Sequence, residues 1–178
     1  MQKVTHIPRY TYSDYEKWKD DWELIDGFPW SKSTSGSAIH QTVSGELLFQ
    51  IKNELNTQPC INKCFVYNEL DWIIDDQNVV RPDVSVICGE SVKKFIEKAP
   101  VLIIEIISES SAYRDKIVKK ELYESQGVKY YIIANPKTKS IEAFELINNI
   151  YKVCLKSVFN FSETCYVILD YAKIWQML

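Results

Sequence analysis

The stretch Val101-Leu102-Ile103-Ile104-Glu105-Ile106-Ile107 decides the fold. Both alternating faces of this run are apolar, which is typical of a central strand covered on both sides of a sheet. A helical pattern follows over residues 111–126 and ends at Gly127, and residues 128–134 form a second apolar strand. This strand–helix–strand passage predicts a parallel crossover.

The flanking segments predict antiparallel hairpins. Asp26-Gly27 is a hairpin turn after a strand at residues 22–25, and Asp75-Asp76-Gln77-Asn78 separates strands at residues 64–74 and 79–88. Asn148-Asn149 separates residues 141–146 from residues 150–158 in the same way. Antiparallel hairpins beside a parallel crossover give a mixed sheet, so the predicted fold class is α/β.

Apolar residues at every fourth position predict a helix over residues 38–55, namely Ile39, Val43, Leu47, Ile51 and Leu55. Short helices are expected at residues 14–18, 91–97 and 171–178. With 178 residues, 46% of them hydrophobic and 25% charged, the chain suits one globular domain. We expect an N-terminal helix and hairpin decoration at residues 1–37, a core at 38–146, and a strand and short helix at 147–178.

The overall composition argues against a membrane protein. No segment approaches the roughly 20 apolar residues that span a bilayer, and the first residues lack the apolar stretch of a signal peptide. We therefore expect a cytoplasmic protein. A formal net charge of −3 does not by itself indicate nucleic-acid binding.

The cysteines are odd in number and contain no CxxC motif; they are Cys60, Cys64, Cys88, Cys154 and Cys165. Cys60 and Cys64 have a spacing that could reach a metal, but no second pair follows. Small buried thiols are therefore the expectation rather than a zinc site, and reduced thiols fit a cytoplasmic protein.

Glu105 is the only charged residue in its apolar strand. Burying an unpaired carboxylate is costly, so this group needs a raised pKa or a cation. In Arg81-Pro82-Asp83, Pro82 interrupts the ladder of hydrogen bonds, and strand alternation puts Asp83 and Ser85 on one face. Two converging carboxylates would repel each other unless a hard cation such as Mg²⁺ lay between them.

The helix after Glu105 supplies a basic group. Asp115, Lys119 and Tyr123 are spaced at i, i+4 and i+8 and share one stripe. Lys119 on that stripe could reach the carboxylates and help an attacking water. The residue pattern leaves open a plainer interpretation. In it, Asp115 and Lys119 form an exposed pair, Asp83 is a turn or strand-edge residue, and Glu105 pairs with Arg81 or Arg114.

Together these residues resemble the PD-(D/E)XK nuclease superfamily and, within it, the Uma group of restriction endonucleases. The resemblance rests on Arg81-Pro82-Asp83, Glu105-Ile106-Ile107-Ser108, Asp115, Lys119, Tyr123, Gly127-Val128, Trp22-Glu23-Leu24-Ile25-Asp26-Gly27 and His40-Gln41. It implies a restriction-endonuclease-like core, with a mixed sheet flanked by helices and an N-terminal β-hairpin extension. Ser108-Glu109-Ser110 and Tyr130-Tyr131-Ile132 depart from the pattern, which weakens any inference that activity is retained.

The resemblance also implies an activity, the Mg²⁺- or Mn²⁺-dependent hydrolysis of DNA. Asp83 and Glu105 would hold the metal. Ile107 occupies the usual position of the motif lysine, so that role passes to Lys119, and Glu23 and His40 would line the same cleft. A homodimer is also implied. His40 could equally be a helix N-terminal residue with no role in the site.

Basic residues near these positions could form a phosphate-contacting rim or a solvated face; they are Lys93, Lys94, Lys98, Arg114, Lys116, Lys120, Lys129, Lys137 and Lys139. Two further functions stay open. One is a nuclease fold that no longer cuts and serves as a binding or assembly module, and the other is a hydrolase of a small phosphorylated substrate.

Overall fold

A six-stranded mixed sheet in the order β10-β9-β8-β7-β6-β3 forms the centre of the chain. The structure, a computed structural model, describes residues 7–32, 37–58, 60, 63–176 and 178. β7 and β8 are parallel, which confirms the predicted crossover, and the other neighbouring pairs are antiparallel. The strands are β3 (Cys64–Asn68), β6 (Val84–Cys88), β7 (Leu102–Ile106), β8 (Tyr130–Asn135), β9 (Ser140–Ile147) and β10 (Ile150–Val153).

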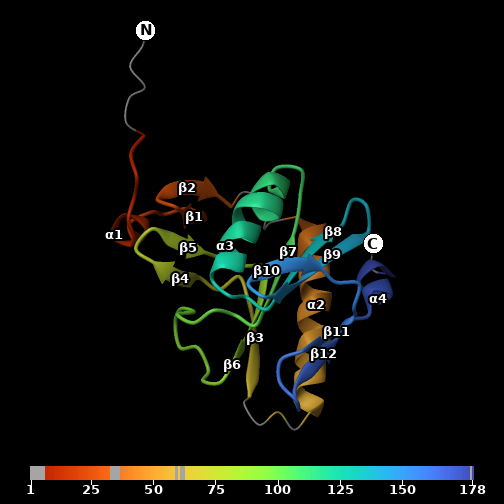
Figure 1. Cartoon of the computed structure of the whole chain (residues 1–178). Coiled ribbons are helices and arrows are strands. Elements are labelled where there is room, and N and C mark those ends of the chain that lie inside the picture. Colours follow the sequence, from red (N-terminus) through yellow and green to blue (C-terminus); the bar gives the residue numbers. More distant parts are fainter. Residues whose placement is uncertain (1–6, 33–36, 59, 61–62, 177) are drawn as a thin grey trace.

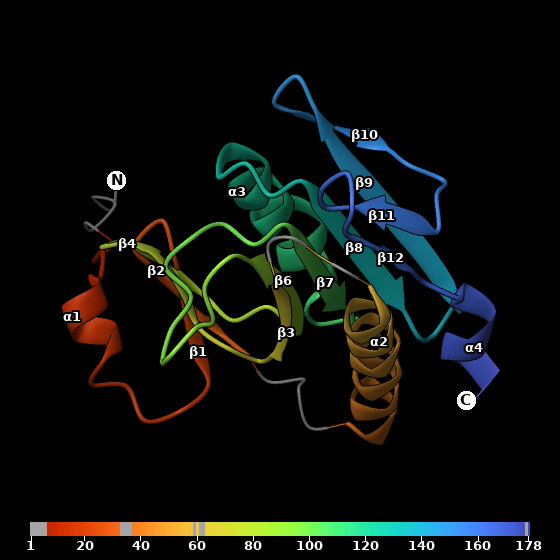
Figure 2. The same ribbon diagram turned by 90° about the horizontal axis from the view of Figure 1, so that it is seen from below.

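Helices cover both faces of this sheet, as Figures 1 and 2 show. On one face, α2 (Ala38–Thr57) buries Val43 and Leu47 against a cluster that includes Ile104. On the other face, the π-helical segment η1 (Arg114–Lys119) continues into α3 (Lys120–Ser125), which buries Tyr123 in a second cluster. Strand alternation puts Glu105 on the face of η1 and α3. The expected α/β class with a mixed sheet is confirmed.

A second sheet of four strands, in the order β2-β1-β5-β4, lies beside the first. It contains β1 (Trp22–Ile25), β2 (Phe28–Ser31), β4 (Trp72–Asp75) and β5 (Asn78–Val80). The predicted hairpin turn is confirmed: Asp26 and Gly27 have φ angles of 51° and 73°, as its two central positions require. Residues 1–6 and 33–36 of the predicted N-terminal decoration lie outside the described residues.

The continuous strands predicted at residues 64–74 and 79–88 are wrong, because the chain passes between the two sheets within each of them. β3 ends at Asn68, and Glu69 adopts a left-handed φ of 48° before the chain enters the smaller sheet as β4. The return passage comes just before β6, at Pro82, which has no N–H to continue a ladder. Asp83 follows at once and stands at this junction.

Two further expectations also need correction. Residues 91–97 form no helix; Ile96 is instead buried and makes an isolated parallel bridge to Trp72. The strand predicted at residues 150–158 is two strands, since β10 ends at Val153 and β11 (Val158–Asn160) pairs with β12 (Tyr166–Ile168) in a separate ribbon. The terminal helices are α1 (Tyr12–Tyr15) and α4 (Tyr171–Gln176).

The expectation of reduced thiols is wrong for four of the five cysteines. Cys60 is joined to Cys165 and Cys64 to Cys88 by disulfide bonds, whereas Cys154 is a buried free thiol. Spacing along the chain gave no sign of this arrangement, because Cys60 and Cys165 are 105 residues apart in sequence.

Candidate functional site

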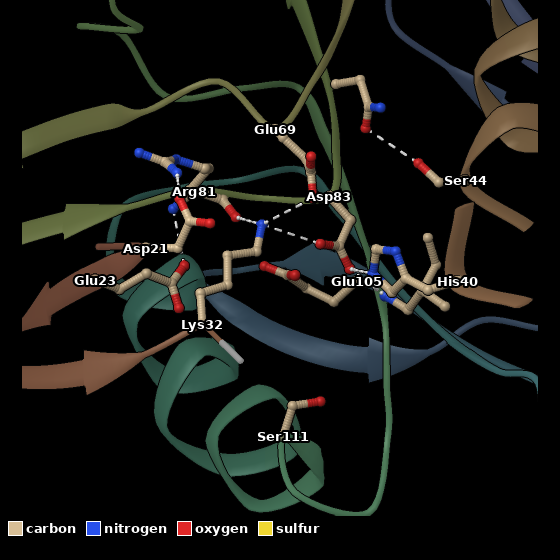
Figure 3. Close-up of polar contacts among 12 residues, drawn as sticks. Asp21, Glu23, Lys32, His40, Ser44, Glu69, Arg81, Asp83, Glu105 and Ser111 are labelled. Atoms are coloured by element: carbon tan, nitrogen blue, oxygen red, sulfur yellow. Dashed lines mark hydrogen bonds and ion pairs between the residues drawn. The ribbon is translucent and has the colours of Figure 1, made fainter. Parts of the chain in front are cut away.

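Buried ionisable side chains gather where the chain passes between the two sheets. Eight such residues expose at most 6% of their surface: Glu23, Lys32, His40, Asp83, Glu105, Arg114, Asp115 and Lys119. All five site residues predicted from the sequence are among these eight. Figure 3 shows Lys32 and His40 approaching Asp83 from opposite sides. So many charges can be buried together only because they pair with one another.

Asp83 is held by three donors. Its Oδ2 accepts hydrogen bonds from the Ile106 N–H at 2.8 Å and from Nε2 of His40 at 3.0 Å, and its Oδ1 lies 3.1 Å from Nζ of Lys32. Burial alone would raise the pKa of Asp83. The hydrogen bond from His40 and the charge of Lys32 outweigh burial and hold that pKa well below its usual value, so Asp83 is ionised.

His40 lies in the first turn of α2, whose N-cap residue Ser37 accepts the His40 N–H at 3.1 Å. Burial disfavours a charged imidazole, but the hydrogen bond to Asp83 and its charge raise the pKa of His40 above the usual value. His40 is therefore more than a helix N-terminal residue, because it contacts a carboxylate of the cluster.

Glu105 receives two hydrogen bonds from the helical segment that follows it. Its Oε1 accepts hydrogen bonds from Nζ of Lys119 and from the hydroxyl of Tyr123, both at 2.8 Å. Burial raises the pKa of Glu105 to about 8. Lys119 opposes this effect, while the neighbouring carboxylates, Asp83 first among them, add to it. The Glu105 carboxyl therefore holds a proton more tightly than a free carboxyl does, chiefly because it is buried.

Lys119 joins the strand that carries Glu105 to the smaller sheet. Its fully buried ammonium lies 2.6 Å from Oε1 of Glu23, on β1, and 2.8 Å from Oε1 of Glu105. Burial would lower the pKa of Lys119, but Glu105 and Glu23 raise it above its usual value. The same Glu23 oxygen accepts the Arg81 N–H at 2.8 Å, so Glu23 closes the junction between the sheets.

The plainer interpretation is wrong for Lys119 and Glu105, although Asp83 does lie in a bend directly before β6. Asp115 and Lys119 are both buried and lie 3.8 Å apart, so they are no exposed helix pair. Glu105 pairs with neither candidate arginine: Arg81 contacts Asp71 and Asp21, and Arg114 lies 3.3–3.4 Å from Asp115 and Glu23.

Sequence reasoning missed two residues of the cluster, Lys32 and Glu69. The ammonium of Lys32 donates to the Arg81 carbonyl at 2.8 Å and lies 3.8 Å from Oε1 of Glu69, an oxygen that is buried without a hydrogen bond. Lys32 stands in a polar stretch with no periodicity, so nothing in the sequence marked it. The left-handed φ of Glu69 follows from the change of sheet and has no signature in the residue itself.

The nine basic residues considered as a phosphate rim do not act as one group. Arg114 is buried in the site, Lys116 lies 2.5 Å from Glu142, and Lys137 pairs with Glu109. Acidic partners therefore neutralise part of the proposed rim.

The donor chemistry fits a divalent cation in one respect and not in another. The charges of Asp83 and other carboxylates add to the raised pKa of Glu105, and carboxylate oxygens are the ligands that a hard cation prefers. However, no group of three or more His, Cys, Asp or Glu side chains in the described part of the chain stands ready to hold a metal ion. Asp83 and Glu105 are each already paired with a cation, Lys32 for Asp83 and Lys119 for Glu105.

Residues 11–165 match the family model Uma2, described as "Putative restriction endonuclease". The chain belongs to the Uma2 family. Its Uma2 region spans β1, both layers of helix and the strand that carries Glu105, so the family resemblance predicted from the motifs is confirmed.

The Uma2 fold also occurs in a solved structure, that of a putative nuclease of the DUF820 family from Anabaena variabilis. The two proteins share 16% sequence identity and superpose with a TM-score of 0.72. The match covers 93% of this chain and 97% of the other. At this identity the likeness shows the fold. No curated protein matches this Uma2 chain in sequence, and no helix among its described residues is long and apolar enough to cross a membrane.

Proposed function

We propose that this Uma2 protein is a nuclease that hydrolyses DNA phosphodiester bonds with Mg²⁺ or Mn²⁺. The observation that carries the proposal is the convergence of Asp83, Glu105 and Lys119, from separate elements, at one buried junction. Membership of a family of putative restriction endonucleases supports a nuclease, and the carboxylates whose charges act on Glu105, Asp83 first among them, support a cation.

In this proposal Asp83 and Glu105 hold the metal ion. When bound, such an ion polarises a phosphoryl oxygen and lowers the pKa of a bound water. His40 and Lys32 fix the orientation of the Asp83 carboxylate, and Glu23 holds Lys119 beside Glu105. The ammonium of Lys119 is fully buried among carboxylates, so it can assist an attacking water only after it gives up one of these contacts.

The test is a cleavage assay on supercoiled and linear duplex DNA with Mg²⁺, Mn²⁺ or EDTA. We expect cleavage that requires a divalent cation and falls by about 10²-fold or more in Asp83→Asn, Glu105→Gln and Lys119→Met. Lys116→Met is the matched control, because it removes a half-exposed lysine from the same helical segment. Metal-independent cutting, or full activity in Lys119→Met, contradicts the mechanism.

A second candidate is a nuclease fold that no longer cuts and serves as a binding or assembly module. One observation favours it: Asp83 and Glu105 already face the cations of Lys32, His40 and Lys119. It predicts a folded protein that binds Mg²⁺ weakly or not at all, also in the presence of DNA. Calorimetric titration of Mg²⁺ and Mn²⁺ into the protein separates the two candidates.

A cytoplasmic location, one domain over residues 1–178 and a homodimer also stay predictions. β10 is an edge strand of the larger sheet, and it exposes 52% of Ile150 and 73% of Val153. An apolar edge of this kind supports association with a second copy. Sedimentation equilibrium gives the oligomeric state directly.

A further inference from the structure

Four cysteines from distant segments meet at one edge of the larger sheet. Cys64 begins β3 and Cys88 ends β6, and the two are cross-strand partners. Cys60 follows α2 and is bonded to Cys165, which directly precedes β12. Sγ of Cys64 lies 3.5 Å from Sγ of Cys165, so the two disulfides touch and the four sulfur atoms form one cluster.

We propose that the reduced form of this cluster binds one Zn²⁺ through four thiolates. With both disulfides closed, the described residues contain no group of three or more His, Cys, Asp or Glu side chains that could hold a metal. Reduction changes this state: a dithiol gives two electrons and two protons to each disulfide and is itself oxidised to a disulfide. The four resulting thiols bind Zn²⁺ and release their four protons.

The spacing of the sulfur atoms favours a single ion. At a Zn–S distance of about 2.3 Å, the sulfur atoms of a tetrahedral site lie about 3.8 Å apart. The 3.5 Å between Cys64 and Cys165 is already close to this value. Each bonded pair must separate, which rotations of the cysteine side chains allow. Sulfur atoms in contact leave no room for a cluster of several irons. Four thiolates are the donor set of structural zinc sites.

The cysteine cluster is separate from the candidate functional site around Asp83. In the β3–β6 pair, Cys64 and Cys88 form one end of the ladder, and Asn68 and Val84 form the end next to Asp83. Four residues at about 3.3 Å each put about 13 Å between the two ends. The zinc ion would thus be structural, joining the segment after α2, the edge strand β3 and the β11–β12 ribbon. It takes no part in the hydrolysis proposed above.

The remaining cysteine provides a matched control. Cys154 is a buried free thiol outside the two disulfides. Cys154→Ser therefore removes a buried sulfur from the chain without touching the cluster, whereas Cys165→Ser removes a sulfur that is 1% exposed from the cluster itself.

The experiment uses the full chain, reduced with dithiothreitol, loaded with Zn²⁺ and desalted without oxygen. Zinc is measured by plasma mass spectrometry, and free thiols by alkylation with and without a chelator. We expect one zinc per chain, four thiols that react only after chelation, and the same zinc content in Cys154→Ser. Cys165→Ser is expected to lose the zinc while keeping the circular dichroism of the wild type.

A second measurement covers the case in which Cys165→Ser fails to fold. Co²⁺ added to the reduced wild type is expected to give the visible absorption of tetrahedral cobalt thiolate. A reduced, folded wild-type chain without zinc and with four freely reactive thiols overturns the proposal. Disulfides that persist through dithiol treatment of the folded chain overturn it as well. Neither readout depends on DNA cleavage, so each proposal can fail independently of the other.

Discussion

Replacing Lys119 by Met tests whether one buried ammonium holds the two sheets together. Met keeps most of the length and the packing of the lysine stem but removes a charge that lies 2.6 Å from Glu23 and 2.8 Å from Glu105. Removing one partner of a buried ion pair typically costs about 3–5 kcal/mol, because the other charge stays buried and uncompensated. Glu23 keeps Arg114 and the Arg81 N–H, and Glu105 keeps Tyr123, so the loss should fall within that range.

The assay is urea unfolding at pH 7, followed by far-ultraviolet circular dichroism and by tryptophan fluorescence. We expect Lys119→Met to lower the free energy of unfolding by about 3–5 kcal/mol without changing the urea dependence. The matched variant Lys116→Met breaks a half-exposed pair with Glu142 and should cost about 0–1 kcal/mol. The loss in Lys119→Met should shrink at pH 5, because the orphaned Glu23 carboxylate can then take up a proton.

Equal losses in the two variants would refute this reasoning. They would mean that water reaches Lys119 and screens its contacts, so the ammonium would not be the link between β1 and β7. Two unfolding probes that disagree in Lys119→Met alone would instead show that the smaller sheet separates first.

Three further predictions follow from the same structure. The folded-state pKa of Glu105, about 8, lies above its ordinary value of 4.5, so its stabilising contribution is complete below pH 4.5 and is lost as the pH rises through 8. Without metal, the melting temperature should therefore fall between pH 5 and pH 9, and Glu105→Gln should flatten this dependence; an unchanged slope in that variant contradicts the assignment. Mg²⁺ or Mn²⁺ binding seen by calorimetry should vanish in the double variant Asp83→Ala/Glu105→Ala and release protons at pH 7, and heats that persist would place the metal elsewhere. Ile104→Ala, at a fully buried position of the α2 cluster, should cost about 2–5 kcal/mol in urea unfolding, whereas Val153→Ala, 73% exposed, should stay within about 0.5 kcal/mol; similar values for both would mean that α2 does not cover β7.

The sheet could be predicted where the signal is local. The apolar run around Glu105 identified β7, and the alternation of Ser85 with Val84 and Val86 identified the face of β6 that joins the α2 cluster. The turn Asp26-Gly27 also has the φ angles that its residue types predict. In each case the residues within one short segment determine its structure.

The errors arose where distant contacts decide the structure. Residues 91–97 have the composition of a short helix, but they bend at residues 93–95 and Ile96 bridges to Trp72 instead. Nothing near Glu69 indicates that the chain changes sheet there. The same holds for Lys32, whose role depends on Asp83 and Arg81, about 50 residues away in sequence.

The sequence predicts the position of the helix after β7 but not its type. Residues 111–126 were expected to be α-helical, and the segment from Arg114 to Lys119 is instead a π-helix. Periodicity does not separate the two, because both put Asp115, Lys119 and Tyr123 toward the sheet. π-Helical turns are rare and occur mainly at functional sites, in agreement with the burial of Lys119 here.

The charged residues of the candidate site lie far apart in the sequence, and this affects when the site can form during synthesis. Its charged groups come from positions between Glu23 and Lys119, and Glu23 meets Lys119 across 96 residues of chain. Because closing long loops is slow, contacts of this range form late in folding. During translation from the N-terminus, the carboxylates emerge before their lysine, and Glu105 has no ammonium partner until the ribosome has released the following helix. A nascent chain therefore cannot assemble this cluster of charges before Lys119 has left the ribosome.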